Sequence, residues 1–446
     1  MVRHGMSDGG RTGSATPHPM VAAGNGPGNI VNAVVDHLFR HEAGRIVATL
    51  TRVFGLARID LAEDVVQGAL LKALQQWSFR GIPENPPAWI MQVAKNMALD
   101  LLRRQATLRT KEEDIASIYE PDPTIVDGLF LESEIRDDQL RMMFACCHPR
   151  LPEESRIALT LKTLCGFSVQ EIAHAFLLAE ETVAKRLVRA RQTLREESAK
   201  FEIPSGEGLR HRVGAVQRAL YLLFNEGYSA SSGNEVVRRD LVEEAIRLAT
   251  LLSCHPSGDA PATHALLALM LLHGSRLSAR TDDGGNILLL QDQDRSLWDH
   301  RMLQAGLKEL DRSAAGSTIS SYHLEAGIAA CHCLAPDYES TDWSRILTLY
   351  DMLLKLDDSP LVGLNRAVAV AKVHGPEAAL ATIEQIPNIG RLDGYYLSHA
   401  VIAEQHLTLR HFGEAACHYR KALALTRLPA ERMFISQKLK QCEQAL

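Results

Sequence analysis

Helical periodicity is the feature that most limits how this chain can fold. From Ile30 to the C-terminus, nearly every patterned segment repeats its apolar residues at intervals of three and four, and almost none alternates them. Residues 287–290 are the only strand-like stretch. The pattern therefore predicts an all-α protein. At roughly 100–200 residues per domain, 446 residues predict about three domains.

Changes in composition along the chain suggest where those domains divide. Residues 1–29 are rich in Gly, Ser, Thr and Pro, and we interpret them as a disordered leader in which Met6 and Met20 are alternative start sites. Residues 105–135 mix charges with prolines, and residues 201–210 break the helical pattern, so both are predicted to be linkers. The predicted domains are residues 30–104, 136–200 and 210–446.

Charge and cysteine content exclude several classes of protein. The net charge of −6 gives the whole chain no field that attracts nucleic acid, so DNA binding would require a local basic patch. Eight scattered cysteines with no CxxC pair favour reduced thiols over a disulfide framework. No apolar run approaches the roughly 20 residues that span a bilayer, and the leader lacks the apolar core of a signal peptide. We expect a cytoplasmic protein with no membrane partner.

Two amphipathic helices are predicted in the first domain. The segment DLAEDVVQGALLKALQQW buries an apolar stripe and leaves Asp64 and Gln67 on a polar, mostly acidic face. The segment PPAWIMQVAKNMALDLLRRQ turns Trp89 and Leu101 inward and projects polar groups from its far end. Those groups belong to Asn96, Asp100, Arg103 and Arg104. They suit base edges and phosphates, and the alternative is a solvated face with cations near a helix C-terminus.

A helix-turn-helix motif is predicted in the second domain. In FSVQEIAHAFLLAEETVAKRLVRARQTLRE, Ser168 and Glu171 have the spacing of a capping box, and a tight connection at 177–179 leads to a second helix. One face of that helix carries Thr182, Lys185, Arg186 and Arg189. Residues 182–195 include five basic and no acidic residues, as a recognition helix in a major groove requires. The alternative is a helical hairpin that does not bind DNA, because the turn has no glycine.

In this order, the motifs resemble the two conserved domains, regions two and four, of bacterial sigma-70 family factors. The similarity is strongest to the extracytoplasmic-function group. The segments FACCHPRLPEESRIALTLKTLCGFSVQEIAHAF, YLLFNEGY and DDGGNILLLQDQDRSLWD further resemble a subgroup with a large helical C-terminal extension. The resemblance implies a dissociable subunit that gives core RNA polymerase its promoter specificity, with the extension modulating that activity in cis. It implies neither a cofactor nor catalysis.

The resemblance also implies specific contact surfaces. Asp64 and Gln67 match the helix that docks onto the clamp helices of the polymerase β′ subunit, and region four is expected at the β flap. The residues that match the segment engaging the minus-ten promoter element are Asn96, Asp100, Arg103 and Arg104. Those that match the minus-thirty-five recognition face are Thr182, Lys185, Arg186 and Arg189. In the linker, Glu112, Glu113 and Asp114 match a segment that threads toward the polymerase RNA path, or they form a solvated loop.

The last part of the chain, about residues 325–446, is repetitive. HFGEAACHYRKALAL (411–425) aligns with DWSRILTLYDMLLKL (342–356), and GPEAALATIEQI (375–386) forms a third copy. The spacing is close to the ~34 residues of a tetratricopeptide helix pair. Such pairs stack into a curved array, which either offers a surface to a protein or peptide partner or serves only as a scaffold.

The segment TDDGGNILLLQDQDRSLWD concentrates polar residues around a tight turn. The resemblance makes it a signature of the subgroup with no assigned role, carried by Asp283, Gly284, Asp292, Asp294, Arg295 and Trp298. A buried ion pair and a contact with another domain or ligand both fit it. We expect no metal at Cys146-Cys147-His148 or Cys331-His332-Cys333, because residues two apart on a helix point about 200° apart. With no Walker, HExxH or GxSxG motif, no catalytic residue is predicted.

Two other functions compete with a sigma factor. A helix-turn-helix transcriptional regulator with a repeat-built effector-binding domain would act on DNA without replacing the sigma subunit, and co-purification with polymerase distinguishes it. A repeat scaffold with vestigial DNA-binding parts fits poorly with the basic asymmetry of residues 182–195. The sequence leaves open the promoter sequence, the inducing signal, the oligomeric state and whether the extension activates or inhibits.

Overall fold

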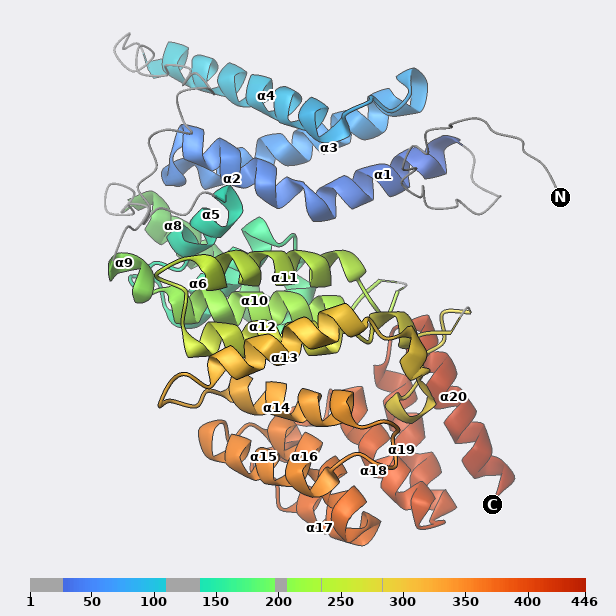
Figure 1. Ribbon diagram of the computed structural model, residues 1–446. Coiled ribbons are helices and arrows are strands. Elements are labelled where there is room, and N and C mark those ends of the chain that lie inside the picture. The colour runs from blue at the N-terminus through green and yellow to red at the C-terminus, as the bar shows by residue number, and fades with distance from the viewer. Residues whose placement is uncertain (1–26, 110–136, 197–206, 234, 283) are drawn as a thin grey trace, which may run out of the picture.

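The computed structural model describes residues 27–109, 137–196, 207–233, 235–282 and 284–446 (Figure 1). The regular elements in these ranges are helices, which confirms the all-α prediction. The strand-like reading of residues 287–290 is wrong: Ile287 makes one isolated bridge to Thr281, and a short 3-10 turn, Leu290–Asp292, follows it. In the described ranges, no helix combines the length and hydropathy that crossing a bilayer would need.

The first four α-helices form a body with its own core, at the top of Figure 1. They are α1 (Pro27–His41), α2 (Ala43–Phe54), α3 (Ile59–Arg80) and α4 (Pro86–Arg109), with a 3-10 turn at Leu56–Arg58. On α4, Ile90, Ala94, Ala98 and Leu102 face this core at four-residue spacing. The expectation that Leu101 points inward is therefore wrong, because its neighbour Leu102 takes the core position and Leu101 is 37% exposed.

The next eight α-helices share a second core. They are α5 (Asp138–Cys146), α6 (Glu153–Leu164), α7 (Val169–Phe176), α8 (Glu180–Glu196), α9 (Glu207–Arg210), α10 (Val213–Tyr228), α11 (Arg239–Cys254) and α12 (Pro261–Gly274). Phe144 of α5, Ile172 of α7 and Phe167 between α6 and α7 pack in the same cluster as Leu220 of α10 and Leu248 of α11. The break at residues 201–210 thus divides the sequence without dividing the hydrophobic core.

The remaining helices complete the lower part of Figure 1. They are α13 (His300–Ser313), α14 (Ser321–Leu334), α15 (Trp343–Leu356), α16 (Pro360–His374), α17 (Pro376–Glu384), α18 (Tyr396–Thr408), α19 (Phe412–Leu425) and α20 (Pro429–Gln444). Consecutive helices pack as hairpins, for example α15 on α16 and α18 on α19. The aligned positions Ile346 and Ala415 are both fully buried, whereas in the third copy Ala379 rather than Ala378 is buried. The tetratricopeptide assignment stays a prediction.

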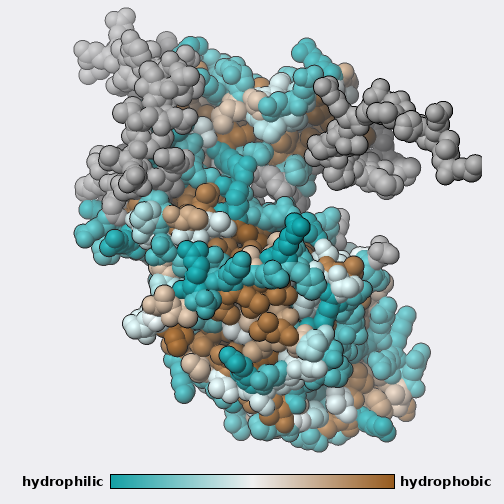
Figure 2. Space-filling model, viewed as in Figure 1, coloured by the Kyte–Doolittle hydropathy of each residue, from teal (hydrophilic) through white to brown (hydrophobic). Residues whose placement is uncertain are grey.

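The surface separates by polarity in a way that follows this packing. Figure 2 shows apolar side chains gathered over the middle of the visible face, around α11 to α13, with polar side chains along the edges. Two large apolar side chains on α3 project from the molecule instead of packing. Leu71 is 60% exposed and Phe79 is 91% exposed. Their exposure is relevant to the surfaces considered below.

A close approach between α2 and α6 joins the first body to the second. A Cβ atom at Gly44 would overlap the backbone carbonyl of Leu164, so only glycine allows this contact. Ala48 of α2 and Ile59 of α3 extend the contact into the second core. Half-buried ion pairs surround it, including Arg52 to Asp138 at 3.3 Å and Arg45 to Glu244 at 3.0 Å.

We predict that Gly44→Ala lowers stability, because the added methyl group forces α2 away from α6 at a cost of about 1–3 kcal/mol. Thermal unfolding followed by circular dichroism measures the loss. The matched control is Gly214→Ala on α10, where a Cβ would meet no atom within 4 Å. That substitution should stabilise slightly, by about 0.5–1 kcal/mol. An unchanged melting temperature for Gly44→Ala would contradict the tight contact.

Candidate nucleic-acid interface

The capping box that starts α7 has the expected geometry. The Ser168 hydroxyl accepts a hydrogen bond from the Glu171 backbone N–H at 3.1 Å, and the Glu171 carboxylate accepts one from the Ser168 N–H at 2.7 Å. Helix α7 ends at Phe176, and the capping residue Leu177 takes a left-handed conformation with φ 52°. Leu177 adopts the geometry usually given to glycine, so the turn closes without one and α8 begins at Glu180.

Glu171 also anchors the helix-turn-helix to the helices that follow it. Its other carboxylate oxygen accepts hydrogen bonds from Arg238 at 2.9 Å and from the Ser232 hydroxyl at 3.1 Å. Burial alone would raise the pKa of Glu171, but these bonds and those from Ser168 hold it below its usual value. Burial raises the pKa of the second carboxylate near Arg238, Glu226, to about 7. Sequence reasoning missed this link, because its partners lie 67 residues apart.

The predicted recognition face on α8 is only partly free. Thr182, Lys185 and Arg189 are exposed, and Lys185 pairs locally with Glu181 at 2.7 Å. Arg186 instead reaches back to Glu154 on α6 at 2.5 Å, so it is less available to a ligand than its position on the helix suggests. The outward face therefore presents one hydroxyl and two cations on a single helical surface.

The two other basic residues of α8 contact the first body of the structure. Arg191 pairs with Glu63 at 2.6 Å and with Asp60 at 3.2 Å, and Arg195 pairs with Asp60 at 2.9 Å. Both acids lie in the first part of α3. The basic asymmetry seen in the sequence is thus split between a solvent-facing surface and a contact between the two bodies. The sequence pattern alone could not make this division.

The polar end of α4 forms a second candidate surface. The residues on it are all exposed: Asn96, Asp100, Arg103 and Arg104. The last three lie four, seven and eight positions after Asn96, which places all of them on one side of the helix. Gln92 donates to the Asn96 side chain at 3.0 Å, and Arg103 lies 3.7 Å from Asp100. Trp89 is half-buried, and its ring packs edge-on to Trp77 at 5.3 Å.

The acidic face of α3 forms a third candidate surface. Asp64 and Gln67 are exposed, and Leu71 lies on the same side, one helical turn beyond Gln67. Leu71 adds one exposed apolar side chain to this otherwise polar face. Leu71 lies outside the apolar stripe of α3, and this is the sequence signal that could have identified it as part of the exposed face.

The signature segment is built into the fold. Asp283 lies outside the described residues, and Gly284 donates its N–H to Asp282 in a tight turn. Asp292 is exposed, and Asp294 accepts a hydrogen bond from the Ser296 N–H. Arg295 donates to the carbonyls of His332 and Ala335 at the end of α14 and lies 4.6 Å from the buried Trp298 ring. No ion pair joins the described members of this segment, so the buried ion-pair reading has no support.

The cysteine and histidine clusters have no metal-binding arrangement. In the part of the chain that the structure describes, no group of three or more His, Cys, Asp or Glu side chains could hold an ion. Cys146 and Cys147 are buried, and burial raises the pKa of both thiols. The linker residues Glu112, Glu113 and Asp114 lie outside the described residues.

Comparison with known proteins assigns two parts of the chain to a family. Residues 38–107 match the model described as Sigma-70 region 2, and residues 141–194 match Sigma-70, region 4. The ECF RNA polymerase sigma-E factor of Haemophilus influenzae is 33% identical over 156 residues, which cover 34% of this chain and 79% of that protein. The chain belongs to the extracytoplasmic-function group of the sigma-70 family. Members of this family are transcription initiation factors rather than enzymes.

Other relatives differ in how much of this chain they cover. An uncharacterized protein of Rhizobium meliloti is 39% identical over 384 residues, covering 85% of this sigma factor and 90% of that protein. The probable RNA polymerase sigma factor RfaY of Xanthomonas campestris is 32% identical over 184 residues, or 37% of this chain and 44% of that protein. Residues 212–314 match a family of unknown function (DUF6596). No solved structure matches the chain.

We predict that Arg238→Ala destabilises the sigma factor by about 3–5 kcal/mol at pH 8, because it leaves Glu171 and Glu226 as buried, uncompensated carboxylates. The loss should be smaller at pH 5, where Glu226, with its raised pKa of about 7, is protonated and needs no cation. Urea unfolding at both pH values measures this difference.

The matched control for this prediction is the neighbouring Arg239→Ala. Arg239 is exposed and, among the described residues, donates only to the Ser278 hydroxyl at 3.3 Å, so its loss should cost under ~0.5 kcal/mol. Equal effects of the two substitutions, or an Arg238→Ala loss that grows at pH 5, would show that the buried carboxylates do not depend on Arg238.

Proposed function

We propose that this sigma factor directs promoter recognition by core RNA polymerase, with α8 reading the minus-thirty-five element. The observation that carries the proposal is the exposed surface of Thr182, Lys185 and Arg189 on the second helix of a region-four helix-turn-helix. A recognition helix needs outward cations for phosphates and a guanidinium for guanine, and α8 offers both. Arg186 joins this face after exchanging Glu154 for a phosphate or base.

The exposed end of α4 is proposed to engage the minus-ten element. Asn96 and Asp100 offer polar groups that can hold separated bases, and the nearby guanidinium groups of Arg103 and Arg104 suit phosphates. With Trp89 packed against Trp77, this surface lacks an outward aromatic ring among its described residues. Recognition at this element then relies on polar contacts more than on base stacking.

Asp64, Gln67 and Leu71 on α3 form the proposed docking surface for the clamp helices of the polymerase β′ subunit. Their exposure in the free chain supports this, since the surface needs no rearrangement before docking. The neighbouring acids Asp60 and Glu63 pair with Arg191 of α8. The proposed docking surface and the α8 contact therefore lie side by side on α3. Region four is proposed to meet the β flap once α8 leaves α3.

The C-terminal extension is proposed to modulate activity in cis by holding region four. The shared core of α5 to α12 and the Glu171–Arg238 pair support this role, because both fix α7 relative to the extension. Arg238→Ala should therefore reduce initiation while leaving core binding through α3 intact. A protein or peptide partner on the hairpins α15 to α20 is a further part of the proposal.

We predict that Arg189→Ala weakens promoter recognition by about 1–3 kcal/mol without lowering thermal stability, because its side chain is exposed. Arg186→Ala should weaken recognition and also lower stability slightly, since it breaks the pair with Glu154. Run-off transcription with purified core polymerase measures recognition. If transcription requires this protein but neither substitution reduces it, α8 does not read the minus-thirty-five element. DNA binding without any need for core polymerase would favour a helix-turn-helix regulator instead.

We predict that Asp64→Arg abolishes most binding to core polymerase without unfolding the protein, because the new cation faces a partner suited to an acidic surface. A pull-down with core polymerase measures binding, and circular dichroism checks the fold. The control Glu84→Arg makes the same charge change at another exposed position of the first body and should bind normally. If the two variants bound equally well, α3 would not be the docking helix.

A further inference from the structure

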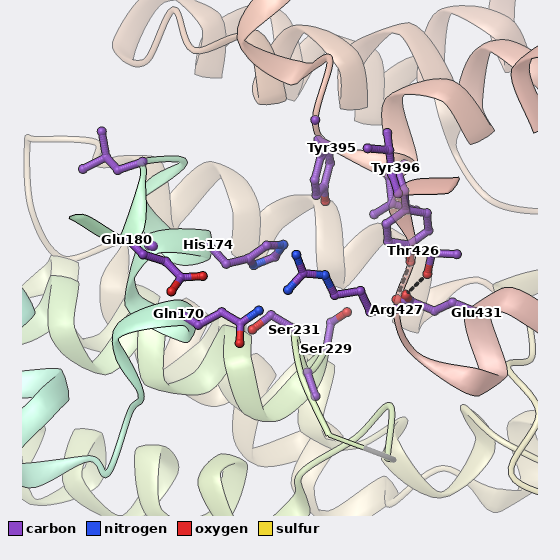
Figure 3. A pocket seen from close by; sticks show the side chains of 16 residues that line it. Gln170, His174, Glu180, Ser229, Ser231, Tyr395, Tyr396, Thr426, Arg427 and Glu431 are labelled. Carbon is purple, nitrogen blue, oxygen red and sulfur yellow. Dashed lines mark hydrogen bonds between the residues drawn. The ribbon is translucent and has the colours of Figure 1, made fainter. Parts of the chain in front are cut away.

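A cavity of about 290 Å³ lies where the helix-turn-helix meets the C-terminal hairpins. Four segments that are far apart in the sequence line it: residues 170–180 of the helix-turn-helix, 229–231 after α10, 394–397 at the start of α18, and 425–431 between α19 and α20 (Figure 3). None of the three surfaces described above includes it. Its volume is about that of ten water molecules, enough for a small metabolite.

Two exposed side chains of opposite charge, Arg427 and Glu180, line this cavity and have no partner among the described residues. Figure 3 shows the Arg427 guanidinium extending into the cavity toward His174, with Glu180 on the far wall. Within the described ranges, no hydrogen bond or ion pair engages either the Arg427 guanidinium or the Glu180 carboxylate. The third charged residue, Glu431, is already occupied, since its two oxygens accept the hydroxyls of Tyr396 and Thr426 at 2.5 Å each.

The rest of the lining is neutral. Desolvation, with a further contribution from Arg427, lowers the pKa of His174 below its usual value, so its imidazole is uncharged at neutral pH. The hydroxyl of Ser229 and the amide of Gln170 add hydrogen-bonding groups. Apolar walls come from Leu178, Leu397 and Leu425. The cavity thus combines one free cation, one free carboxylate, neutral polar groups and an apolar surface.

We propose that this cavity binds a small zwitterion with an apolar side group, that is, a free α-amino acid. Its carboxylate would form a bidentate contact with Arg427, and its ammonium would face Glu180. A dianion would be repelled by Glu180 and a simple cation by Arg427, whereas a zwitterion satisfies both walls. The leucine side chains accommodate the apolar group.

The location gives such a ligand a route to the DNA-reading helix. Glu180 lies in the first turn of α8, and Arg427 lies on the loop between the last two helices of the chain. A bound amino acid therefore joins the start of the recognition helix to the C-terminal hairpins. This regulatory consequence rests on the proposed function, whereas the binding itself does not.

Isothermal titration calorimetry on the full-length protein tests the proposal without polymerase or DNA. The probes are L-leucine, L-methionine and L-phenylalanine, each compared with its amide, which lacks the carboxylate, and its N-acetyl form, which lacks the ammonium. At least one free amino acid should bind, and each of its two derivatives should bind at least about tenfold more weakly, since each leaves one charged wall unpaired. No binding by any of the three at millimolar concentration would overturn the proposal.

Two variants locate the site. Arg427→Ala should remove the preference for the free amino acid over its amide, and Glu180→Gln should remove the preference over the N-acetyl form. Arg301→Ala, which removes one exposed cation on α13 outside the cavity, should bind as the parent protein does. If both cavity variants kept the full preferences, the amino acid would bind elsewhere and the assignment would be wrong. A run-off assay with and without the amino acid then tests the link to transcription separately.

Discussion

The buried ion pair between Glu171 and Arg238 is the interaction on which the arrangement of the helix-turn-helix depends. Glu171 performs two tasks with one carboxylate, because it closes the capping box that starts α7 and also accepts the Arg238 guanidinium from the extension. A charge this deeply buried is tolerated only with such partners. The start of the helix-turn-helix is therefore specified jointly by a local motif and by Arg238. Arg238 lies in residues 212–314, which match the family of unknown function.

Local signals were readable in the sequence, and long-range contacts were not. The capping spacing of Ser168 and Glu171, the turn at 177–179 and the outward position of Arg189 follow from residues within a few turns of one another. The pairing of Arg191 with Glu63 bridges 128 residues, so no periodicity reveals it. For the same reason, the linker composition of residues 201–210 suggested a domain division, although Phe144 and Leu220 lie in one core.

Arg295 of the signature segment and Arg280 just before it are half-buried cations that are accommodated without carboxylates. Arg295 donates to carbonyls at the C-terminal end of α14, and Arg280 donates to the Tyr228 carbonyl that ends α10. Helix C-termini carry partial negative charge, and each guanidinium also lies over an aromatic ring: Arg280 is 3.8 Å from the Tyr228 centroid. These contacts tie the segment before α13 to the C-terminal ends of α10 and α14, which gives the polar signature an architectural role.

The Glu171–Arg238 and Asp60–Arg195 ion pairs differ in how firmly they join the helices that carry them. Arg238 is 7% exposed, so breaking its pair strands carboxylates in the protein interior, and α7 stays with the extension. Arg195 is 61% exposed where it meets Asp60, and ion pairs this accessible contribute at most about 1 kcal/mol because water and salt replace them readily. The first body also keeps its own core in α1 to α4. The exposed Arg195–Asp60 pair is therefore easier to break than the buried Glu171–Arg238 pair, whereas Ala48 and Ile59 still hold the first body to the second core.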